Sequence, residues 1–465
     1  MPDERFEEHL SHPVGRGRVP AHDGVAGGAI CGDLVRIGVE VQCDRVSDAG
    51  FEAEGCGAAL AAASAAVDLV RGANVLDAAR VGTHAISDAL GGLSPGKLHA
   101  AELAADALAQ ALGRAVADVE GDVLIDPERT LVAMSGGVDS AVAALRSGPH
   151  AATVTLELWR DPANDAEASC CSASAVRGAR AIAHAMGLPH FTLDLREEFR
   201  AGVVEPWLAD HAAGLTPNPC VRCNGAVRLD AMLAFADRVG AATLTTGHYA
   251  RRTPEGLLRL AADPAKDQAY MLAGLSRATL ARMRFPLGEL EKGQVRAIAA
   301  EHDLPVASKP DSQDLCFLAG TGRAAFLARH GGLGERPGDI LDVAGRVLGR
   351  HRGAHQFTVG QRRGLEIGGT PEPLYVVRTD AGANTVTVGP RAALATSDVR
   401  VRDARLHAPA SEVRAVKLRY RAPAVPCTLH GDTIELHEPV DGAAPGQTAV
   451  FLRGDAVLGC ATIAA

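Results

Sequence analysis

Aromatic residues are scarce in this sequence. They make up 3% of its 465 residues, whereas hydrophobic residues as a whole make up 47%. The cores must therefore be built from aliphatic side chains, mainly Leu, Val and Ala. Long apolar runs are also missing: none reaches about 18 residues, which excludes a transmembrane helix. The charged N-terminal segment MPDERFEEHL lacks the apolar stretch of a secretory signal. The sequence therefore predicts a cytoplasmic protein with no membrane partner.

Positive charge is scarce in the first quarter of the chain. Residues 1–120 contain nine Lys and Arg against eighteen Asp and Glu, so this part carries the whole net charge of -9. An acidic domain repels polyanions, whereas the balanced remainder can carry local basic patches. Residues 396–421 form such a stretch, with seven basic residues against three acidic ones. The stretch is either a solvated face or a binding surface for a polyanion such as RNA.

Changes in the hydrophobic pattern divide the chain into four expected domains. Short alternating strands followed by Ala-rich helices indicate an α+β domain first. Strands then alternate with helices, which indicates a doubly wound parallel sheet. Short strands punctuated by glycine follow, and they predict a small β module and a terminal β-barrel. The expected bounds are 1–120, 128–330, 331–385 and 386–465.

A glycine-rich segment, Ser135-Gly-Gly-Val-Asp-Ser140, stands between an expected strand and an expected helix. Two glycines let the backbone approach a ligand closely, and a helix N-terminus offers N–H groups to an anion. The segment lacks the lysine of the GxxxxGK[ST] loop. It resembles the pyrophosphate loop of the ATP pyrophosphatase family. The resemblance implies that ATP is cleaved between its α and β phosphates, with Asp139 helping to hold Mg²⁺.

Cysteine is sparse but clustered. Ten cysteines are too few for a disulfide scaffold of this length, so the clustered ones are better explained as ligands or catalysts. Cys220 and Cys223 form a CxxC motif within TPNPCVRCN, and Cys316 lies in DSQDLCF. A second CxxC motif is absent, which disfavours a zinc ribbon. Cys170 and Cys171 form a further pair.

These segments together resemble the bacterial tRNA 2-thiouridylase family from about residue 128 to the C-terminus. The matching segments are MSGGVDS, SCC, TPNPCVRCN, TGHYAR, KDQAYML, KPDSQDLCF, HQFTVGQRRGL, LRYR and PGQTAVF, in the order of the family. The resemblance implies ATP-dependent 2-thiolation of the wobble uridine of tRNA, a flipped-out target base and a cysteine desulfurase or another sulfur donor as partner.

The family's functional residues carry over by position. Cys223 matches the catalytic nucleophile, and Cys316 matches the cysteine that takes up a persulfide sulfur. The implied nucleotide contacts are Ala133, Met134, Ser135, Gly136, Gly137, Val138, Asp139, Ser140, Leu156 and Gly247. The implied tRNA contacts are Asn218, Pro219, Cys220, His248, Lys266, Asp267, Gln268, Arg419, Tyr420 and Gln447.

Cys220 departs from the commonest family pattern, in which an aspartate occupies this position. The change produces a set of three cysteines, Cys220, Cys223 and Cys316, which is the ligand set of a [4Fe–4S] cluster with one open iron. Sulfur transfer through a persulfide and through a cluster both stay open. We favour the persulfide route, because the cluster interpretation depends mainly on this one position.

The N-terminal domain resembles the iron–sulfur scaffold family of IscU, SufU and NifU N-terminal domains over about residues 5–115. The resemblance rests on AICGD, GCGAAL and PGKLH. It implies metal ligands at Cys31, Asp33, Cys56 and His99, whereas Ala100 replaces the third cysteine of the family. This donor set suits zinc better than a normal iron–sulfur cluster. The domain could dock a cysteine desulfurase, relay sulfur or a cluster through Cys31 and Cys56, or be a zinc-bound structural remnant, and we favour a docking or sulfur-relay role.

Two other functions compete with thiolation. One is a different pyrophosphate-loop ligase that acts on a small metabolite, and the other is a pure iron–sulfur or sulfur carrier. The basic stretch, the β-rich tail and the paired cysteines disfavour the ligase. The intact Ser135–Ser140 loop disfavours the carrier.

Overall fold

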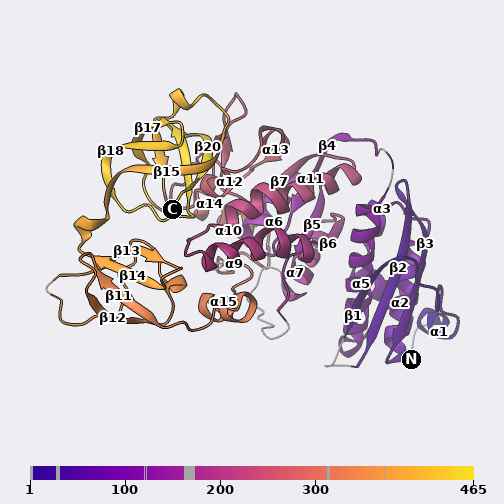
Figure 1. Cartoon of the computed structure of the whole chain (residues 1–465). Coiled ribbons are helices and arrows are strands. Elements are labelled where there is room, and N and C mark those ends of the chain that lie inside the picture. Colours follow the sequence, from indigo (N-terminus) through magenta and orange to yellow (C-terminus); the bar gives the residue numbers. More distant parts are fainter. Residues whose placement is uncertain are drawn as a thin grey trace. The chain divides into compact units, whose positions relative to one another are not determined.

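A computed structural model of the chain describes residues 4–27, 32–119, 121, 123–161, 173–311, 315–370 and 372–465. These residues form two compact units that interleave along the sequence. The first unit comprises Met1–Arg196, Ala231–His248 and Arg282–Cys316, and the second comprises Glu197–Asp230, Tyr249–Ala281 and Phe317–Ala465. Figure 1 shows the helices and strands of each unit.

The N-terminal domain of the first unit is an antiparallel sheet of order β1-β2-β3, covered by helices (Figure 1). Val35, Ile37 and Val39 alternate along β2 and are fully buried, as an alternating strand pattern predicts. Gly24 lets β1 approach α5, because a Cβ at this position would lie 2.1 Å from the Ala107 carbonyl oxygen. The elements are α1 (Glu4–Ser11), β1 (His22–Gly27), β2 (Leu34–Gln42), β3 (Arg45–Glu54), α2 (Gly57–Val70), α3 (Val75–Ala78), α4 (Thr83–Ala89) and α5 (Leu98–Ala117).

The second part of this unit is a parallel five-stranded sheet of order β10-β7-β4-β5-β6. The chain runs outward from β4 to β6 and then returns to the other side of β4. Strand β5 is buried along almost its whole length, as a parallel strand covered on both faces requires. The predicted doubly wound sheet is therefore confirmed. Its elements are β4 (Asp126–Ala133), α6 (Val138–Ser147), β5 (Ala152–Glu157), α7 (Ala173–Ala185), β6 (His190–Asp194), α11 (Leu229–Arg238), β7 (Ala241–Thr246), β10 (Met283–Arg284) and α14 (Lys292–Glu301).

Helix α5 of the N-terminal domain packs against β6, the edge strand of the parallel sheet. The approach is close, because a Cβ on Gly113 would lie 1.9 Å from the Thr192 carbonyl oxygen. Beside this contact Arg180 of α7 forms an ion pair with Asp106 of α5, and the two side chains are only 6% and 13% exposed. The N-terminal domain thus shares a buried, ion-paired interface with the parallel sheet.

The helical part of the second unit carries the CxxC segment. Trp207 of α9 packs edge-on against Phe317 and Phe326, and these rings join α9 to α15. The elements are α8 (Arg196–Phe199), α9 (Glu205–Ala212), α10 (Pro219–Cys223), β8 (Arg251–Arg252), β9 (Leu258–Arg259), α12 (Ala269–Leu272), α13 (Arg277–Arg282) and α15 (Arg323–Gly331), with π-helical turns at Arg200–Val204 and Asn224–Arg228.

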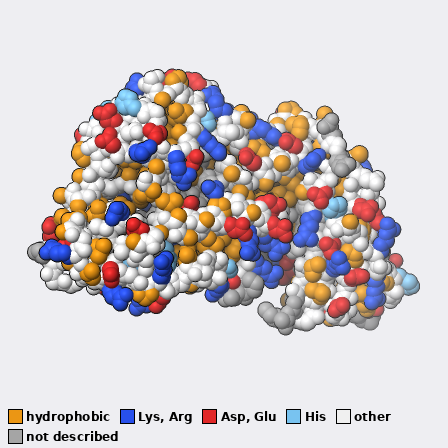
Figure 2. Space-filling model, in the orientation of Figure 1, with side chains coloured by type: hydrophobic (Ala, Val, Ile, Leu, Met, Phe, Trp, Pro, Cys, Tyr) orange, Lys and Arg blue, Asp and Glu red, His pale blue; other side chains and the backbone are white. Residues whose placement is uncertain are grey.

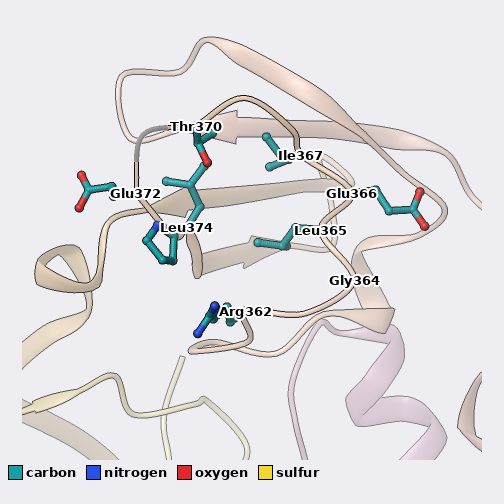
Figure 3. Close-up of a pocket in the computed structure, with 9 residues that line it drawn as sticks. Arg362, Gly364, Leu365, Glu366, Ile367, Thr370, Glu372 and Leu374 are labelled. Atoms are coloured by element: carbon teal, nitrogen blue, oxygen red, sulfur yellow. The ribbon is translucent and has the colours of Figure 1, made fainter.

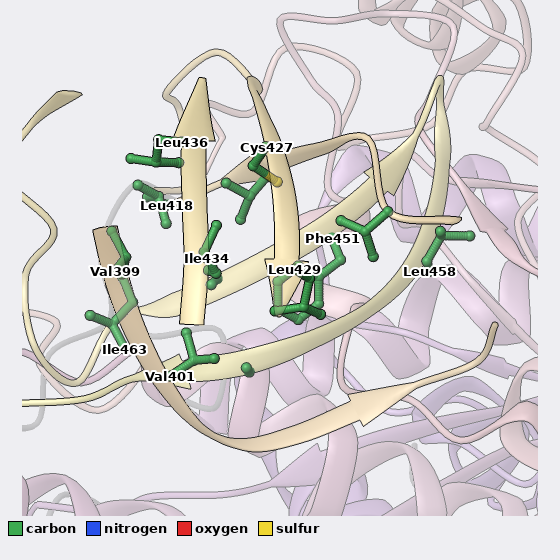
Figure 4. Close-up of a cluster of buried hydrophobic side chains, with 14 of the residues drawn as sticks. Val399, Val401, Leu418, Cys427, Leu429, Ile434, Leu436, Phe451, Leu458 and Ile463 are labelled. Carbon is green, nitrogen blue, oxygen red and sulfur yellow. The ribbon is translucent and has the colours of Figure 1, made fainter. Parts of the chain in front are cut away.

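Two β domains complete the second unit. The first is a four-stranded sheet of order β12-β11-β14-β13. The second is a barrel in which β15, β18, β17, β16, β19 and β20 pair in turn, and pairing of β15 with β20 closes it. Aliphatic side chains with Phe451 fill the barrel (Figure 4). The elements are β11 (Gly338–Asp342), β12 (Val347–His351), β13 (Tyr375–Asp380), β14 (Thr385–Gly389), β15 (Ala395–Leu406), β16 (Ala415–Lys417), β17 (Val425–His430), β18 (Thr433–Asp441), β19 (Thr448–Arg453) and β20 (Ala456–Ile463).

The four-stranded domain carries an open hollow of about 420 Å³. Arg362, Leu365, Ile367 and Leu374 contribute to its lining, whereas Glu366 and Glu372 point outward on opposite sides (Figure 3). The end of the HQFTVGQRRGL motif, residues 362–365, and the residues that follow it form part of the wall. The hollow is shallow and mixed in polarity, and we assign it no ligand.

The apolar residues of segments 429–434 and 450–458 predict one strand in each segment, and both predictions are wrong. The first segment contains the turn between β17 and β18, and the second turns at Gly454 and Asp455 between β19 and β20. Gly454 has a φ of 60°, a left-handed conformation that glycine adopts readily. Among the described residues, no helix is both long enough and apolar enough to span a bilayer.

Candidate functional site

The glycine-rich loop joins the end of β4 to the start of α6. Gly136 has a φ of 66°, and Gly137 occupies the N-cap position of α6. The Ser140 hydroxyl donates a hydrogen bond to the Gly137 carbonyl at 3.0 Å and accepts one from the Ser135 backbone N–H at 3.1 Å. Ser140 is 5% exposed, so in this conformation its hydroxyl mainly fixes the shape of the loop. The loop leads into the start of α6, and the N-terminus of a helix favours binding of an anion.

The loop lies where the winding of the parallel sheet reverses, between β4 and β7. Ligands of open α/β sheets bind at the carboxyl ends of the strands at such a point. Gly247 follows β7 and approaches the loop so closely that a Cβ would lie 2.8 Å from the Asp139 carbonyl carbon and the Ser140 nitrogen. Leu156 is nearly buried near the end of β5, the neighbour of β4. The topology thus brings together the predicted nucleotide residues Ala133–Ser140 and Gly247, with Leu156 on the adjacent strand.

Two lysines that sequence reasoning missed contact this loop. The Lys292 amine lies 2.7 and 2.8 Å from the two carboxylate oxygens of Asp139 and 2.8 Å from Asp311 Oδ1. The Lys309 amine donates a hydrogen bond to the Gly136 carbonyl at 2.8 Å. Lys309 is the first residue of the KPDSQDLCF motif, in which only Cys316 was predicted to have a role. Lys292 lies in none of the matching motifs. Its position was the only available signal, because a lysine in the first turn of a helix opposes the helix dipole and is therefore unusual.

Glu157, at the end of β5, is the buried acid of this sheet edge. Burial raises its carboxyl pKa above the ordinary value, and the nearby Arg196 partly offsets this effect. Asp194, one strand further, accepts hydrogen bonds from Arg196, and these lower its carboxyl pKa against the effect of burial. Arg114 of α5 also contacts Asp194, at 3.3 Å. The N-terminal domain therefore contributes a charge at the carboxyl edge of the parallel sheet.

The CxxC segment of the second unit forms the short helix α10. The Asn218 side chain caps it by accepting a hydrogen bond from the Cys220 N–H at 3.1 Å, and Pro219 occupies the first turn. Cys223 is 8% exposed, whereas Cys220 is half-buried. Residues three apart lie on one face of a helix, so the two thiols point to the same side. The π-helical turn follows, where the Asn224 side-chain amide donates to the Met271 carbonyl at 3.0 Å.

The residues predicted to contact tRNA gather around this helix within the second unit. Met271 belongs to the KDQAYML motif, so α10 packs on the segment that carries Lys266, Asp267 and Gln268. The Tyr270 and Tyr420 rings lie 5.8 Å apart, and the Gln447 amide donates to the Thr216 carbonyl at 2.9 Å. Three motifs that are distant in sequence therefore meet beside the CxxC helix.

Several of these side chains already have partners in the chain. Asp267 is 8% exposed, and its carboxylate accepts hydrogen bonds from the Ala261 and Ala269 N–H groups. The Gln268 side chain accepts from the Tyr249 N–H, and Arg419 donates to the Val359 and Gly442 carbonyls. The Asp267 carboxylate therefore stabilises the conformation of its own segment. The role of the whole set in tRNA binding stays a prediction.

The remaining predicted residues lie in the first unit or outside the described residues. His248 follows Gly247, and its ring Nδ1 lies 2.8 Å from the Thr246 hydroxyl. Cys316 is half-buried and ends the first unit along the chain. Cys31, Cys170 and Cys171 lie outside the described residues. Burial raises the thiol pKa of Cys427 and of Cys460 to about 11, which makes these two barrel cysteines poor nucleophiles.

The N-terminal domain brings three of its four predicted metal ligands together. The ligand atoms of Asp33, Cys56 and His99 all lie within 4.8 Å of one another. Buried Asp33 accepts a hydrogen bond from the Cys56 N–H at 2.8 Å, which is the main reason why its carboxyl pKa is lowered. The His99 ring lies 3.1 Å from the same carboxylate. Gly55 makes the site compact, since a Cβ there would lie 2.0 Å from Asp33 Oδ1. One carboxylate, one thiol and one imidazole form a donor set that zinc accepts.

Three of the seven cations of the basic stretch at 396–421, namely Arg400, Arg402 and Lys417, lie within 4 Å of carboxylates of the chain. Arg400 pairs with Asp432 at 3.2 Å, and Arg402 pairs with Asp403. Arg421 lies over the Tyr420 ring at 5.9 Å. Figure 2 shows Lys and Arg side chains interspersed with Asp and Glu on the visible face. Binding of a polyanion would therefore depend on individual cations rather than on one continuous basic surface.

Four family models match successive parts of the chain. They are described as the NifU-like N terminal domain (residues 3–118), the tRNA methyl transferase HUP domain (128–320), the tRNA methyl transferase PRC-barrel domain (324–390) and the aminomethyltransferase beta-barrel domain (396–463). The order agrees with the four domains seen in the structure.

Curated relatives match with high identity. The chain is 44% identical to the tRNA-specific 2-thiouridylase MnmA of Rhizorhabdus wittichii over 71% of this chain and 90% of that one. It is 46% identical to the MnmA of Salinispora arenicola over 72% and 99%. It is also 42% identical to the bifunctional protein NifU/MnmA of Rubrobacter xylanophilus over 97% of this chain and 96% of that one. Because this last similarity spans both chains almost completely, the chain belongs to the family of bifunctional NifU/MnmA proteins.

Proposed function

We propose that this chain uses ATP to replace the 2-oxygen of the wobble uridine of tRNA with sulfur. The observation that carries the proposal is the glycine-rich loop at the reversal point of the parallel sheet, in a chain that also presents a CxxC helix beside three predicted tRNA-contacting motifs. The tRNA-specific 2-thiouridylases among its relatives support the same reaction. We also propose that the protein acts in the cytoplasm, where it would meet its tRNA substrate.

The first step would be adenylation of the uridine. The uridine O2 forms a bond to the α phosphorus, the bond from that phosphorus to the bridging oxygen breaks, and pyrophosphate leaves with the electron pair while N3 releases its proton. The carbonyl oxygen, a poor leaving group, then departs later as part of AMP. The N–H groups at the start of α6 would hold the phosphates. A Mg²⁺ ion held with the help of Asp139 would neutralise part of the phosphate charge.

The second step would transfer sulfur. The terminal sulfur of a persulfide on Cys316 attacks C2, and AMP leaves with the electron pair of the C2–O bond. The Cys223 thiolate then attacks the Cys316 sulfur, which forms a Cys223–Cys316 disulfide and leaves the transferred sulfur on C2. A cellular thiol must reduce this disulfide before the next turnover. The sulfur would come from a cysteine desulfurase or a similar donor.

Cys220 supports a second route for the sulfur step. Cys220 and Cys223 lie one turn apart on α10, and with Cys316 they supply the three thiolates of a [4Fe–4S] cluster. Such a cluster would hold the sulfur atom at an open iron. Cys220→Asp, with iron content and thiolation measured after anaerobic reconstitution, separates the routes. Full activity of iron-free protein supports the persulfide route, which we favour, and strict dependence on iron supports the cluster.

We propose further that the N-terminal domain binds zinc or an iron–sulfur cluster through Asp33, Cys56 and His99 together with Cys31, and that it docks or relays sulfur from the donor. The compact geometry of the first three residues supports metal binding. Ala100, fully buried at the position of the missing cysteine, favours zinc over a normal cluster. Zinc content of Asp33→Ala against wild type tests this proposal, and an unchanged content would contradict it.

The thiolation proposal is tested with Cys223→Ser and Cys316→Ser in a deletion strain. We expect 2-thiouridine in tRNA to disappear in both variants while ATP binding persists, because the thiols and the phosphate loop are separate residues. Cys43→Ser is the matched control, since this exposed thiol lies in the N-terminal domain away from both sites. Normal 2-thiouridine levels in the deletion strain itself would favour a metabolite ligase or a carrier instead.

A further inference from the structure

Lys292 has an environment that a surface lysine does not need. It is the first residue of α14, where the N-cap Glu291 and Gln294 form a capping box. A positive charge at this end opposes the helix dipole. The side chain is only 12% exposed, which is costly for an ammonium group unless it is paired. Something other than helix stability therefore accounts for a buried amine at this position.

The Lys292 amine is directed at the phosphate loop. It contacts both carboxylate oxygens of Asp139, the second residue of α6, at 2.7 and 2.8 Å, and Asp311 at 2.8 Å. Asp139 is the residue expected to hold the metal that accompanies ATP. Within the same cluster Lys309 contacts the Gly136 carbonyl, and Arg296 contacts Asp311 at 3.1 Å. Three cations and two carboxylates thus converge beside a loop that is built for an anion.

We infer that Lys292 is a triphosphate-binding residue, which exchanges its contact with Asp139 for the β and γ phosphates when Mg²⁺ and ATP enter the loop. The inference rests on the proposed adenylation function. The physical reason is charge balance. Without nucleotide, the amine neutralises a carboxylate that would repel the phosphates. When Mg²⁺ arrives, the metal takes over that role, and the amine becomes available for the phosphate oxygens at no cost in burial.

The same contact would persist through the reaction. As the bond from the α phosphorus to the bridging oxygen breaks, negative charge grows on the departing pyrophosphate, and a fixed ammonium group beside it stabilises that charge. In this role Lys292 holds the phosphates and transfers no proton. AMP, which carries neither the β nor the γ phosphate, would lie outside its reach.

The test compares Lys292→Met with wild type by calorimetric titration of Mg·ATP, inorganic pyrophosphate and AMP. We expect the affinity for Mg·ATP and pyrophosphate to fall about ten- to hundredfold, as for a lost hydrogen bond to a charged group, with AMP affinity unchanged. Lys292→Arg, which keeps the charge, should recover most of the loss. Arg284→Met is the control, because it removes an exposed cation of the same unit from β10.

Every outcome of these titrations either supports or overturns the role of Lys292. Unchanged affinity for Mg·ATP overturns the inference, and an equal loss of ATP and AMP affinity also overturns it, because it shows a merely structural role. Should the single variant fail to fold, Lys292→Met with Asp311→Asn removes one charge of each sign and is judged by the same titrations. Wild-type protein that binds no ATP would instead refute the proposed function, so the two failures are distinguishable.

Discussion

Gly247 offers the sharpest test of how the nucleotide site is packed. In Gly247→Ala the new methyl group would lie 2.8 Å from the Asp139 carbonyl carbon and the Ser140 nitrogen, and 3.0 Å from the Asp139 oxygen. These neighbours are backbone atoms in the first turn of α6, which cannot rotate away as a side chain could. The φ of Gly247 is not in the left-handed region. The substitution therefore acts through steric overlap alone and not through backbone strain.

The magnitude follows from the cost of overpacking, which is about 1–3 kcal/mol for an inserted methyl group. If the loop keeps its shape, the cost appears as a loss of folding stability. If the loop shifts, stability is retained but the N–H groups no longer match the phosphates, and the same cost becomes a loss of ATP affinity of about five- to 150-fold. The two losses together should therefore sum to about 1–3 kcal/mol.

Titration calorimetry with Mg·ATP and urea unfolding measure the two losses separately. Gly178→Ala is the matched control, because this glycine lies in α7 with no atom within 4 Å of its added Cβ. It should leave ATP binding unchanged and raise stability by up to about 1 kcal/mol, since alanine favours a helix. Wild-type affinity and wild-type stability in Gly247→Ala would refute the packing argument.

Three further predictions concern the two units. Burial lowers the pKa of His184 to about 4. Between pH 6.5 and about 4 the unfolded chain therefore binds a proton that the native chain does not, so stability falls as the pH is lowered. His184→Gln should flatten this pH dependence, and an identical slope in urea titrations would contradict the effect. Arg180→Met should cost about 3–5 kcal/mol by leaving Asp106 buried without its main partner, and Asp106→Leu should recover most of that loss in the double variant, whereas additive losses would argue against the pair. Arg419→Ala with Arg421→Ala should weaken tRNA binding and reduce its salt dependence, and an unaltered salt slope would remove this segment from the tRNA surface.

Local sequence patterns predicted the features that depend on local structure. The loop at 135–140 was recognisable because glycines between an apolar strand and a helix have few other uses. The parallel sheet followed from the alternation of strands and helices. The order of its strands did not, because the placement of β7 beside β4 depends on tertiary packing. The proximity of Gly247 to Asp139 is a consequence of that order.

The sequence could not predict the cations of the phosphate loop, because their proximity to the loop also depends on tertiary packing. Lys292 is 153 residues from Asp139 in sequence, and nothing in its neighbourhood marks it apart from its position at a helix start. Asp267 shows the opposite case. The resemblance predicts Asp267 as a tRNA contact, but the sequence could not reveal that its carboxylate is buried and accepts hydrogen bonds from backbone N–H groups.

The interface between α5 and β6 has a consequence for how the two halves of this protein can evolve. Arg180 and Gly113 serve this interface only while both halves are present: without α5 the arginine of α7 would lose its partner Asp106, and without β6 the glycine of α5 would only weaken a helix. A stand-alone thiouridylase has no reason to keep an arginine at the position of Arg180. A stand-alone scaffold likewise has no reason to keep a glycine at the position of Gly113. Fusion therefore fixes a one-to-one ratio of the two halves. It also makes each half depend on the other, so that separating the gene into two would require compensating substitutions on both sides of the interface.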